Sequence, residues 1–152
     1  MDRKSWRTTL TNRPVMLVQV ATLVPHEEHD EVWAVQLATK IMADDVWTAP
    51  IVVERRKSVI MDGHHRFRAA QILRLRTIPA VIVSYGDPGV SLFSWRIGEV
   101  WTPESLIARA GRRELLPMKS TRHVFSPPIG EVVIPLSLLA RASLDHSGVS
   151  AY

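Results

Sequence analysis

The spacing of apolar and polar positions predicts a strand followed by a helix in the first third of the chain. Residues 15–20 form a short, mostly apolar run that is typical of a strand, and Val24-Pro25 ends it. Between residues 30 and 43, apolar positions recur at i, i+3, i+4 and i+7, which predicts a helix with one apolar face. These positions are Ala34, Leu37, Ala38 and Ile41.

The middle of the chain predicts a hairpin that leads directly into a second helix. Two runs rich in β-branched residues, 51–53 and 58–61, flank a charged turn. After residues 62–63 the apolar spacing becomes helical, and residues 77–79, which end in proline, stop this helix. Residues 80–85 predict the next strand. The junction at residues 62–63 is therefore a turn from a strand into a helix.

The C-terminal half predicts shorter elements. Residues 91–95 alternate as a further strand, and residues 103–110 form a short helix with Thr102 as its N-cap. Residues 115–128 contain several prolines and predict an irregular, rigid stretch. Residues 132–139 are compatible with a strand or a helical turn.

This order of elements predicts the α+β class. We expect a single domain at residues 14–139, with a small mixed sheet and helices, a flexible basic tail at 1–13 and a flexible tail at 140–152. The 152-residue length agrees with one domain, and 46% hydrophobic with 22% charged residues excludes disordered and fibrous proteins. No apolar run approaches the ~20 residues that cross a bilayer, and the start lacks a signal peptide core. We therefore expect a soluble, cytoplasmic protein without a membrane partner.

Charge and cysteine content narrow the chemistry further. The formal net charge is +4, and basic residues gather between Arg55 and Arg76, which favours an anionic ligand. The chain has no cysteine, which excludes disulfides, thiolate metal sites and thiol nucleophiles.

The turn Asp62-Gly63-His64-His65-Arg66 is the most informative motif. Glycine between a strand and a helix lets the backbone approach a ligand closely. The free amides at the start of the helix form an anion site, to which two imidazoles and a guanidinium add donors. We interpret the turn as a phosphate site. In the alternative, Asp62 merely caps the helix and the other side chains are solvated.

A second motif, residues 25–29 (Pro-His-Glu-Glu-His), places two carboxylates and two imidazoles in the loop after the first strand. One carboxylate could act as a general base. Zinc binding is a weaker interpretation, because the histidines are three positions apart in a loop and a third ligand is not evident. A solvated acidic helix start is the other alternative, and it suits Glu28 better than Glu27.

The third motif, Lys119-Ser120-Thr121-Arg122-His123, combines hydroxyls with cations in the irregular stretch. It predicts an anion-binding loop, with a basic surface patch as the alternative. Two tryptophans, Trp33 and Trp47, flank the first predicted helix, and we expect both to pack in the core or at its edge.

Together the three motifs resemble those of the free L-serine kinases of the ParB/sulfiredoxin-like fold. Residues 25–27 match the Pro-His-Glu segment of that family, residues 62–66 match its Asp-Gly-His-His-Arg turn, and residues 119–123 match its Lys-Thr-Thr-Arg-His segment. Ser94-Trp95 also corresponds. The resemblance runs from about residue 15 to 139. It departs at Ser120, which stands where the family has threonine and keeps its hydroxyl. It also departs between Trp95 and Lys119, where only a short helix stands and these kinases carry a longer segment.

The resemblance implies a small-molecule kinase that transfers a phosphoryl group from ATP or ADP, with Mg2+, to the hydroxyl of free L-serine and gives O-phospho-L-serine. The shorter segment leaves a related hydroxyl compound open as the acceptor. Glu27 would be the general base, and His65 would stabilise the transferring phosphoryl group. The nucleotide phosphates would bind at Asp62, Gly63, His64, His65 and Arg66, and the substrate at Trp95, Lys119, Ser120, Thr121, Arg122 and His123, with no certain metal ligand.

Two related functions are alternatives. A sulfiredoxin-like reductase is excluded, because its sulfur chemistry requires a cysteine. A ParB-like nucleotide-binding module without kinase activity, DNA-associated or regulatory, stays open. Specific DNA reading would need a helix-turn-helix, yet only one short helix is predicted after Trp95, so we expect no specific nucleic-acid partner. The oligomeric state is not predicted.

Overall fold

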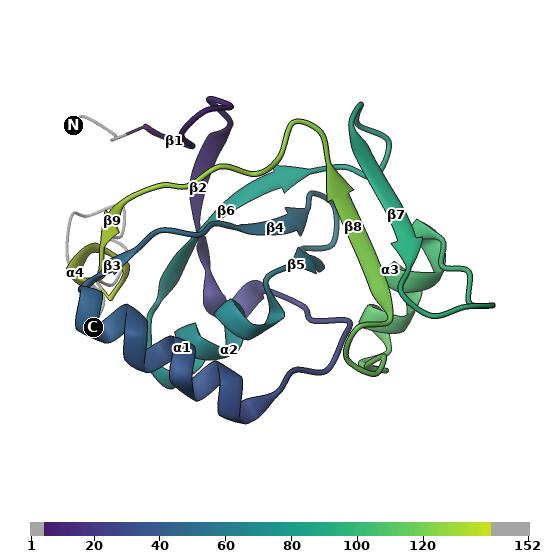
Figure 1. Ribbon diagram of the computed structural model, residues 1–152, viewed down its shortest axis with the longest axis horizontal. Coiled ribbons are helices and arrows are strands. Elements are labelled where there is room, and N and C mark those ends of the chain that lie inside the picture. The colour runs from purple at the N-terminus through teal and green to yellow at the C-terminus, as the bar shows by residue number, and fades with distance from the viewer. Residues whose placement is uncertain (1–4, 141–152) are drawn as a thin grey trace, which may run out of the picture.

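A mixed sheet of five strands forms the centre of the molecule (Figure 1). The computed structural model describes residues 5–140. The strands are β1 (Trp6–Arg7), β2 (Pro14–Gln19), β4 (Ile51–Glu54), β5 (Ile60–Asp62) and β6 (Thr77–Val83). They lie in the order β1-β2-β6-β4-β5, in which β4 and β6 are parallel and the other neighbours are antiparallel. The predicted hairpin of β4 and β5 is confirmed.

Two helices, α1 (Glu31–Asp44) and α2 (His64–Ile72), cover one face of this sheet (Figure 1). Because side chains alternate along a strand, Ile51 and Val53 of β4 pack in the core beneath the helices, whereas Val52 packs in a second cluster on the opposite face. The α1 helix begins at an N-cap, Asp30, whose carboxylate accepts the Trp33 N–H at 2.9 Å. The sheet thus separates two apolar cores, and the prediction of an α+β domain is confirmed.

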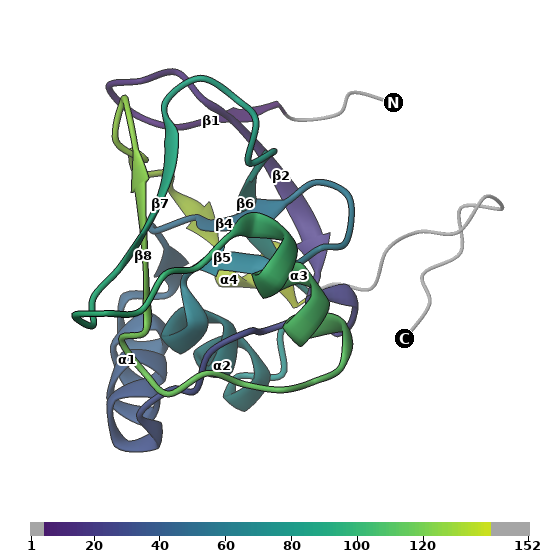
Figure 2. The same ribbon diagram turned by 90° about the vertical axis from the view of Figure 1, so that its right-hand side faces the viewer.

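A two-stranded sheet, β7 (Val90–Ser94) with β8 (Thr121–Phe125), stands beside the central sheet (Figure 2). Its strands are antiparallel, with Ser94 opposite Thr121. The α3 helix (Pro103–Gly111) lies between them in the chain, and Thr102 and Ser105 form a reciprocal capping box at its start. This confirms the predicted short helix and its cap.

Four smaller elements contribute apolar side chains to the main core. They are η1 (Val20–Thr22), β3 (Val46–Trp47), β9 (Ile134–Pro135) and α4 (Leu136–Leu139), and β3 pairs with β9. Residues 132–139 therefore contain both a strand and a helical turn, the two forms that their pattern left open. Within residues 5–140, no helix is long and apolar enough to span a membrane.

Two predicted boundaries differ from the structure. The tail at 1–13 is ordered from Trp6, because Trp6 and Arg7 pair with β2 and the Thr9 N–H donates to the Glu131 carbonyl. Residues 1–4 and 141–152, which include nearly all of the second tail, lie outside the described residues. The strand expected at 80–85 begins at Thr77, since α2 ends early and the chain turns at Arg74, whose φ is 56°.

Residues 121–125, expected to be irregular, form β8. Their polar side chains hide the strand from a hydrophobic pattern. The strand forms because its backbone N–H and C=O groups are hydrogen-bonded to β7, which is distant in sequence.

Candidate active site

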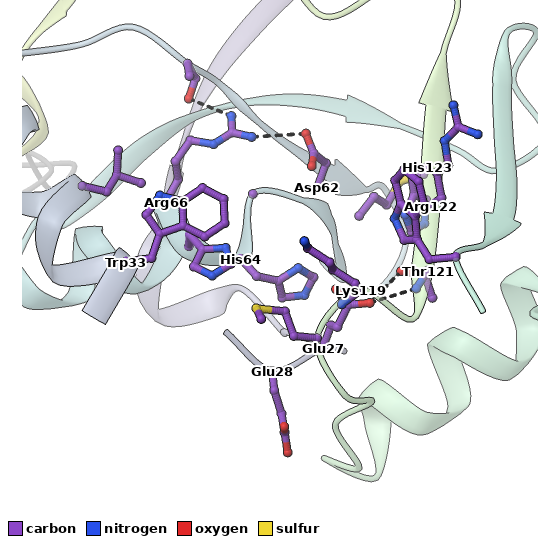
Figure 3. Close-up of a pocket in the computed structure, with 17 residues that line it drawn as sticks. Glu27, Glu28, Trp33, Asp62, His64, Arg66, Lys119, Thr121, Arg122 and His123 are labelled. Atoms are coloured by element: carbon purple, nitrogen blue, oxygen red, sulfur yellow. Dashed lines mark hydrogen bonds and ion pairs between the residues drawn. The ribbon is translucent and has the colours of Figure 1, made fainter. Parts of the chain in front are cut away.

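A single cavity brings the three sequence motifs together (Figure 3). It has a volume of about 510 Å³, which is within the range of small-molecule sites. The loop before α1, the start of α2 and the beginning of β8 form its walls. The cavity is lined by residues 62–66 of the turn, by Glu27 and Glu28 of the loop, and by most residues of the 119–123 motif.

Gly63 shapes the phosphate turn predicted from the sequence. Its φ of 110° lies in the left-handed region, and a Cβ at this position would lie 2.5 Å from Cγ2 of the buried Ile51. No side chain caps α2, so its first amide groups keep their hydrogen-bonding capacity at the cavity wall. The backbone at this turn can therefore bind an anion.

Arg66 and Asp62 form a side-chain ion pair, and neither side chain caps the start of α2. The Arg66 guanidinium donates to the carbonyls of Ala49 at 3.2 Å and Pro50 at 2.5 Å, and to Asp62 Oδ2 at 3.2 Å. Arg66 thereby ties the loop before β4 to α2. The alternative in which Asp62 caps the helix is wrong, because Gly63 occupies the N-cap position.

The Glu27 carboxylate accepts hydrogen bonds from three successive backbone N–H groups, those of residues 119–121. Oε1 accepts the N–H groups of Ser120 at 3.1 Å and Thr121 at 3.0 Å, and Oε2 accepts the Lys119 N–H at 3.2 Å. Lys119 has a φ of 60°, which turns successive amides toward one point. A bond from the Glu28 N–H to the Leu116 carbonyl, 2.8 Å, joins the two segments. Glu27 is therefore fixed in orientation at the cavity wall.

Behind Glu27 lies a buried imidazole to which the sequence reasoning gave no role of its own. His26 has no exposed surface, and its Nδ1 lies 2.7 Å from the Ile60 carbonyl. Its Nε2 lies 2.9 Å from Thr121 Oγ1, which in turn lies 3.1 Å from Glu27 Oε1. The position of His26 inside the Pro-His-Glu motif was the signal available in the sequence. The zinc interpretation finds no support, because residues 5–140 contain no group of side chains suited to a metal ion.

The histidines of the phosphate turn are neutral hydrogen-bonding groups. His64 Nε2 accepts the His26 N–H at 3.2 Å, and His65 Nε2 accepts the Asp30 N–H at 3.0 Å. A backbone N–H can only donate, so each neutral ring carries its proton on Nδ1. Burial lowers the pKa of both rings, that of His64 strongly. They can donate to a phosphate, but positive charge must come from elsewhere.

Unpaired positive charge lies on the opposite wall, at Lys119 and Arg122, whereas the Arg66 guanidinium of the turn is paired with Asp62. The Arg122 guanidinium lies 4.9 Å from the ring of Trp95, which is 58% exposed. His123 does not add charge, since burial lowers its pKa to about 3, and its Nε2 lies 2.8 Å from the Tyr85 hydroxyl. The buried Ser120 side chain donates to the Pro117 carbonyl and is the one predicted site residue that does not line the cavity.

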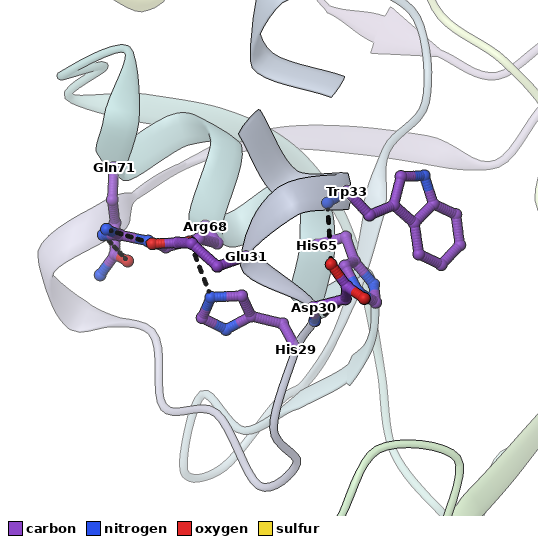
Figure 4. Close-up of polar contacts among 7 residues, drawn as sticks. All are labelled: His29, Asp30, Glu31, Trp33, His65, Arg68 and Gln71. Carbon is purple, nitrogen blue, oxygen red and sulfur yellow. Dashed lines mark hydrogen bonds and ion pairs between the residues drawn. The ribbon is translucent and has the colours of Figure 1, made fainter. Parts of the chain in front are cut away.

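Trp33 forms part of the cavity wall (Figure 3). It is 53% exposed, so it lies at the edge of the core, and its ring lies 4.2 Å from the His65 ring. An ion pair of Glu31 with Arg68, at 2.9 Å, joins the start of α1 to α2 (Figure 4). The packing prediction is confirmed for Trp47, which is 1% exposed.

Comparison with known proteins gives sequence relatives over part of the chain. The family profile described as ParB N-terminal domain matches residues 3–93. An ATP-dependent L-serine kinase from Desulfurococcus mucosus is 35% identical over 104 residues, which cover 66% of this chain and 41% of that protein. Another from Staphylothermus marinus is 36% identical over 84 residues, which cover 53% of this chain and 33% of that protein. The chain thus spans less than half of either relative.

A solved structure supports the fold over a larger range. A free serine kinase in complex with AMP aligns with a TM-score of 0.77 and 13% identity, over 91% of this chain and 98% of that chain. Identity at this level shows the fold alone, and it confirms the ParB/sulfiredoxin-like fold predicted from the sequence.

Proposed function

This chain belongs to the ParB N-terminal domain family, and on that premise we propose that it is a small-molecule kinase. The proposed reaction transfers the terminal phosphoryl group of ATP to the hydroxyl of free L-serine and gives O-phospho-L-serine. One observation carries the proposal: a carboxylate held in fixed orientation, Glu27, faces the same cavity as the amides that follow Gly63. The names of the two sequence relatives favour ATP, and ADP is tested below as a second donor.

Phosphoryl transfer requires positioning and charge stabilisation more than covalent chemistry from the protein. The acceptor hydroxyl gives its proton to Glu27 while its oxygen bonds to the terminal phosphorus, and the bond from that phosphorus to the bridging oxygen breaks. Glu27 Oε2 accepts one amide bond and so keeps a lone pair for this proton. The turn amides, with the Nδ1–H groups of His64 and His65, would bind the phosphoryl oxygens.

The two ends of the cavity suit the two substrates. Trp33, Leu37 and Ala49 form an apolar wall beside the phosphate turn, where we place the nucleobase. Lys119 and Arg122 supply positive charge at the other end, where we place the carboxylate of the acceptor. The compact segment between Trp95 and Lys119 leaves free L-serine or a related hydroxyl compound as the acceptor.

Magnesium usually accompanies the nucleotide phosphates and neutralises the charge that develops on them. Residues 5–140 offer no ready-made cage for it, because no three suitable side chains converge. Asp62, with 54% of its side chain exposed, is the carboxylate of the phosphate turn and is paired with Arg66. We therefore propose that Mg2+ enters on the nucleotide, with Asp62 as its partner from the turn.

No specific nucleic-acid partner is part of this proposal. In the part of the chain that the structure describes, α3 is flanked by β7 and β8 and lacks the second helix of a helix-turn-helix. The proposed substrates, a nucleotide and a free amino acid, are consistent with a cytoplasmic protein.

Phosphorus NMR with Mg2+, L-serine and either ATP or ADP tests the proposal. We expect O-phosphoserine with ATP, and a loss of about 10²-fold to 10⁴-fold in turnover for Glu27→Gln with nucleotide binding retained. Glu28→Gln is the matched control, because Figure 3 shows this side chain turned away from Glu27. Retained activity in Glu27→Gln with loss in Glu28→Gln would move the base to Glu28. Nucleotide binding without product would instead favour the nucleotide-binding module without kinase activity.

A further inference from the structure

Two of the peptide groups that hold Glu27 are also bound on their far side. Glu27 accepts the Lys119 N–H on Oε2 at 3.2 Å and the Thr121 N–H on Oε1 at 3.0 Å (Figure 3). The carbonyls of these two peptide groups belong to Met118 and Ser120, the preceding residues. What binds those carbonyls therefore bears on the orientation of Glu27.

The chain that leaves β7 supplies the donors. The Arg96 guanidinium donates from Nη2 to the Met118 carbonyl at 3.2 Å. The Trp95 N–H donates to the Ser120 carbonyl at 3.1 Å. Residues 95 and 96 thus bind the backs of the two peptide groups whose N–H groups Glu27 accepts.

Ser94 closes this turn of the chain. Its Oγ accepts the Arg96 N–H at 3.0 Å, and its single proton has two acceptors in reach, the carbonyls of Arg96 at 3.0 Å and Ser120 at 3.3 Å. Ser94 also lies opposite Thr121 in the pair of β7 with β8. The hydroxyl therefore holds residues 94–96 in a tight turn that directs the Trp95 N–H to the Ser120 carbonyl.

Two physical effects connect these contacts to Glu27. Lys119 has a φ of 60°, a conformation that a residue with a side chain keeps only where surrounding contacts hold it. Hydrogen bonds to the carbonyls on both sides of Lys119 resist rotation of the peptide groups out of this turn. A carbonyl that accepts a hydrogen bond also makes the N–H of the same peptide group a stronger donor. The contacts of residues 94–96 therefore fix the direction of Glu27 and strengthen the hydrogen bonds that it accepts.

We propose that Ser94 and Arg96 are positioning residues for Glu27, which act through the two peptide groups whose N–H groups it accepts. The inference rests on the proposed function, in which Glu27 removes the proton of the acceptor hydroxyl. Neither side chain lines the cavity, so both affect the reaction through the orientation and basicity of Glu27. A base held in its reacting direction speeds the transfer, because little reorientation precedes the reaction.

Ser94→Ala, Ser94→Thr and Ser91→Ala form one test series. Alanine removes the hydroxyl that closes the turn, and threonine restores it. Ser91→Ala is the matched control, because Ser91 lies on the same strand but pairs with Val124 rather than with Thr121. We expect about a threefold to tenfold fall in kcat for Ser94→Ala with a nearly unchanged KM, and nearly wild-type values for the other two variants. A raised KM with an unchanged kcat would overturn the proposal.

The pH profile of Ser94→Ala gives a readout that general destabilisation would not move. Weaker N–H donors stabilise the ionised carboxylate less, so the acid limb of kcat/KM should move to higher pH, by up to about half a unit. The titratable and charged groups around Glu27 are His26 and Glu28 of its loop, His64 and His65 of the phosphate turn, and the cations of residues 119–123. Ser94→Ala alters none of these groups. A shift to lower pH, or no shift, would overturn the proposal.

Arg96→Met tests the second contact. Methionine keeps a long unbranched side chain but cannot donate to the Met118 carbonyl. Arg7→Met is the matched control, because Arg7 is also exposed and donates to a backbone carbonyl, that of Asn12, at 2.9 Å. We expect about a twofold to fivefold fall in kcat for Arg96→Met and none for Arg7→Met. Equal kcat values for the two variants would overturn the role of Arg96.

Amide hydrogen exchange measured by NMR tests the same contacts without any activity. We expect the amides of Lys119 and Thr121 to exchange about threefold to tenfold faster in Ser94→Ala than in Ser91→Ala. Equal exchange rates in the two variants would overturn the inference. If the wild-type protein makes no O-phosphoserine, the proposed function fails, while the exchange rates still decide whether residues 94–96 hold these amides.

Discussion

Substitution of Gly63 by alanine is the sharpest test of how the fold builds the phosphate turn. The added Cβ would lie 2.5 Å from Ile51 Cγ2 and 3.0 Å from Ile51 Cβ, and Ile51 is fully buried on β4. Overpacking of a core costs roughly 1–3 kcal/mol. The φ of 110° adds backbone strain of roughly 1–3 kcal/mol for a residue with a side chain. Gly63→Ala should therefore lower the free energy of unfolding by about 2–6 kcal/mol, a large share of the roughly 5–15 kcal/mol of a typical domain.

Urea unfolding followed by tryptophan fluorescence measures this change. Gly111→Ala is the matched control, because nothing lies within 4 Å of a Cβ there and its φ is not positive. We expect that variant to be neutral or stabilised by up to about 1 kcal/mol. Ile51→Ala lowers the overpacking cost, since Gly63→Ala should be less damaging in that background, where the 2.5 Å contact with Cγ2 is gone and the 3.0 Å contact with Cβ and the backbone strain persist. A destabilisation by Gly63→Ala of less than about 1 kcal/mol would refute the reasoning.

Two further predictions concern the nucleobase wall and the buried histidines. Trp33→Ala should weaken ATP binding about tenfold, because one stacked base is worth roughly 1–3 kcal/mol, with little effect on stability. Calorimetry that finds an unchanged affinity would contradict this placement. The second prediction is that stability falls as the pH drops from 7.5 to 5.0. His26, His64 and His123 have lowered pKa values in the folded protein, so the unfolded chain binds more protons below about pH 6.5, and for His123 the loss continues toward pH 3. The slope approaches about 1.4 kcal/mol per pH unit for each ring, and equal urea midpoints at the two pH values would contradict it.

Local signals in the sequence predicted most of the framework. The amphipathic spacing of α1, the hairpin that ends at Asp62 and the Thr102 cap of α3 are each encoded within about a dozen neighbouring residues. The β8 strand and the pairing of Trp6 and Arg7 were missed, because both depend on partners distant in sequence.

In the candidate site, too, local motifs were predicted from the sequence, whereas contacts between distant segments were not. The motif turn at Gly63 and the carboxylate of Glu27 are visible in the sequence, because each stands in a short motif that follows a predicted strand. That Glu27 is held by the backbone amides of residues 119–121 was not visible, because an amide carries no residue identity. The neutral state of His64 was hidden for a related reason, since it depends on burial and on a backbone donor from His26.

Because β7 pairs with β8, the shape of one side of the cavity can change in evolution independently of the groups that would handle the phosphate. Ser94 lies opposite Thr121, and the Trp95 N–H donates to the Ser120 carbonyl at 3.1 Å, so residues 95–120 leave and return at one point. Each doubling of such a closed excursion costs only about 0.6 kcal/mol in loop entropy. Glu27 and Gly63 lie outside it. Insertions and deletions within residues 97–115, which leave Leu116, Lys119 and Ser120 beside Glu27 in place, can therefore reshape one side of the cavity, and with it the proposed choice of acceptor, while the groups that would handle the phosphate stay in register.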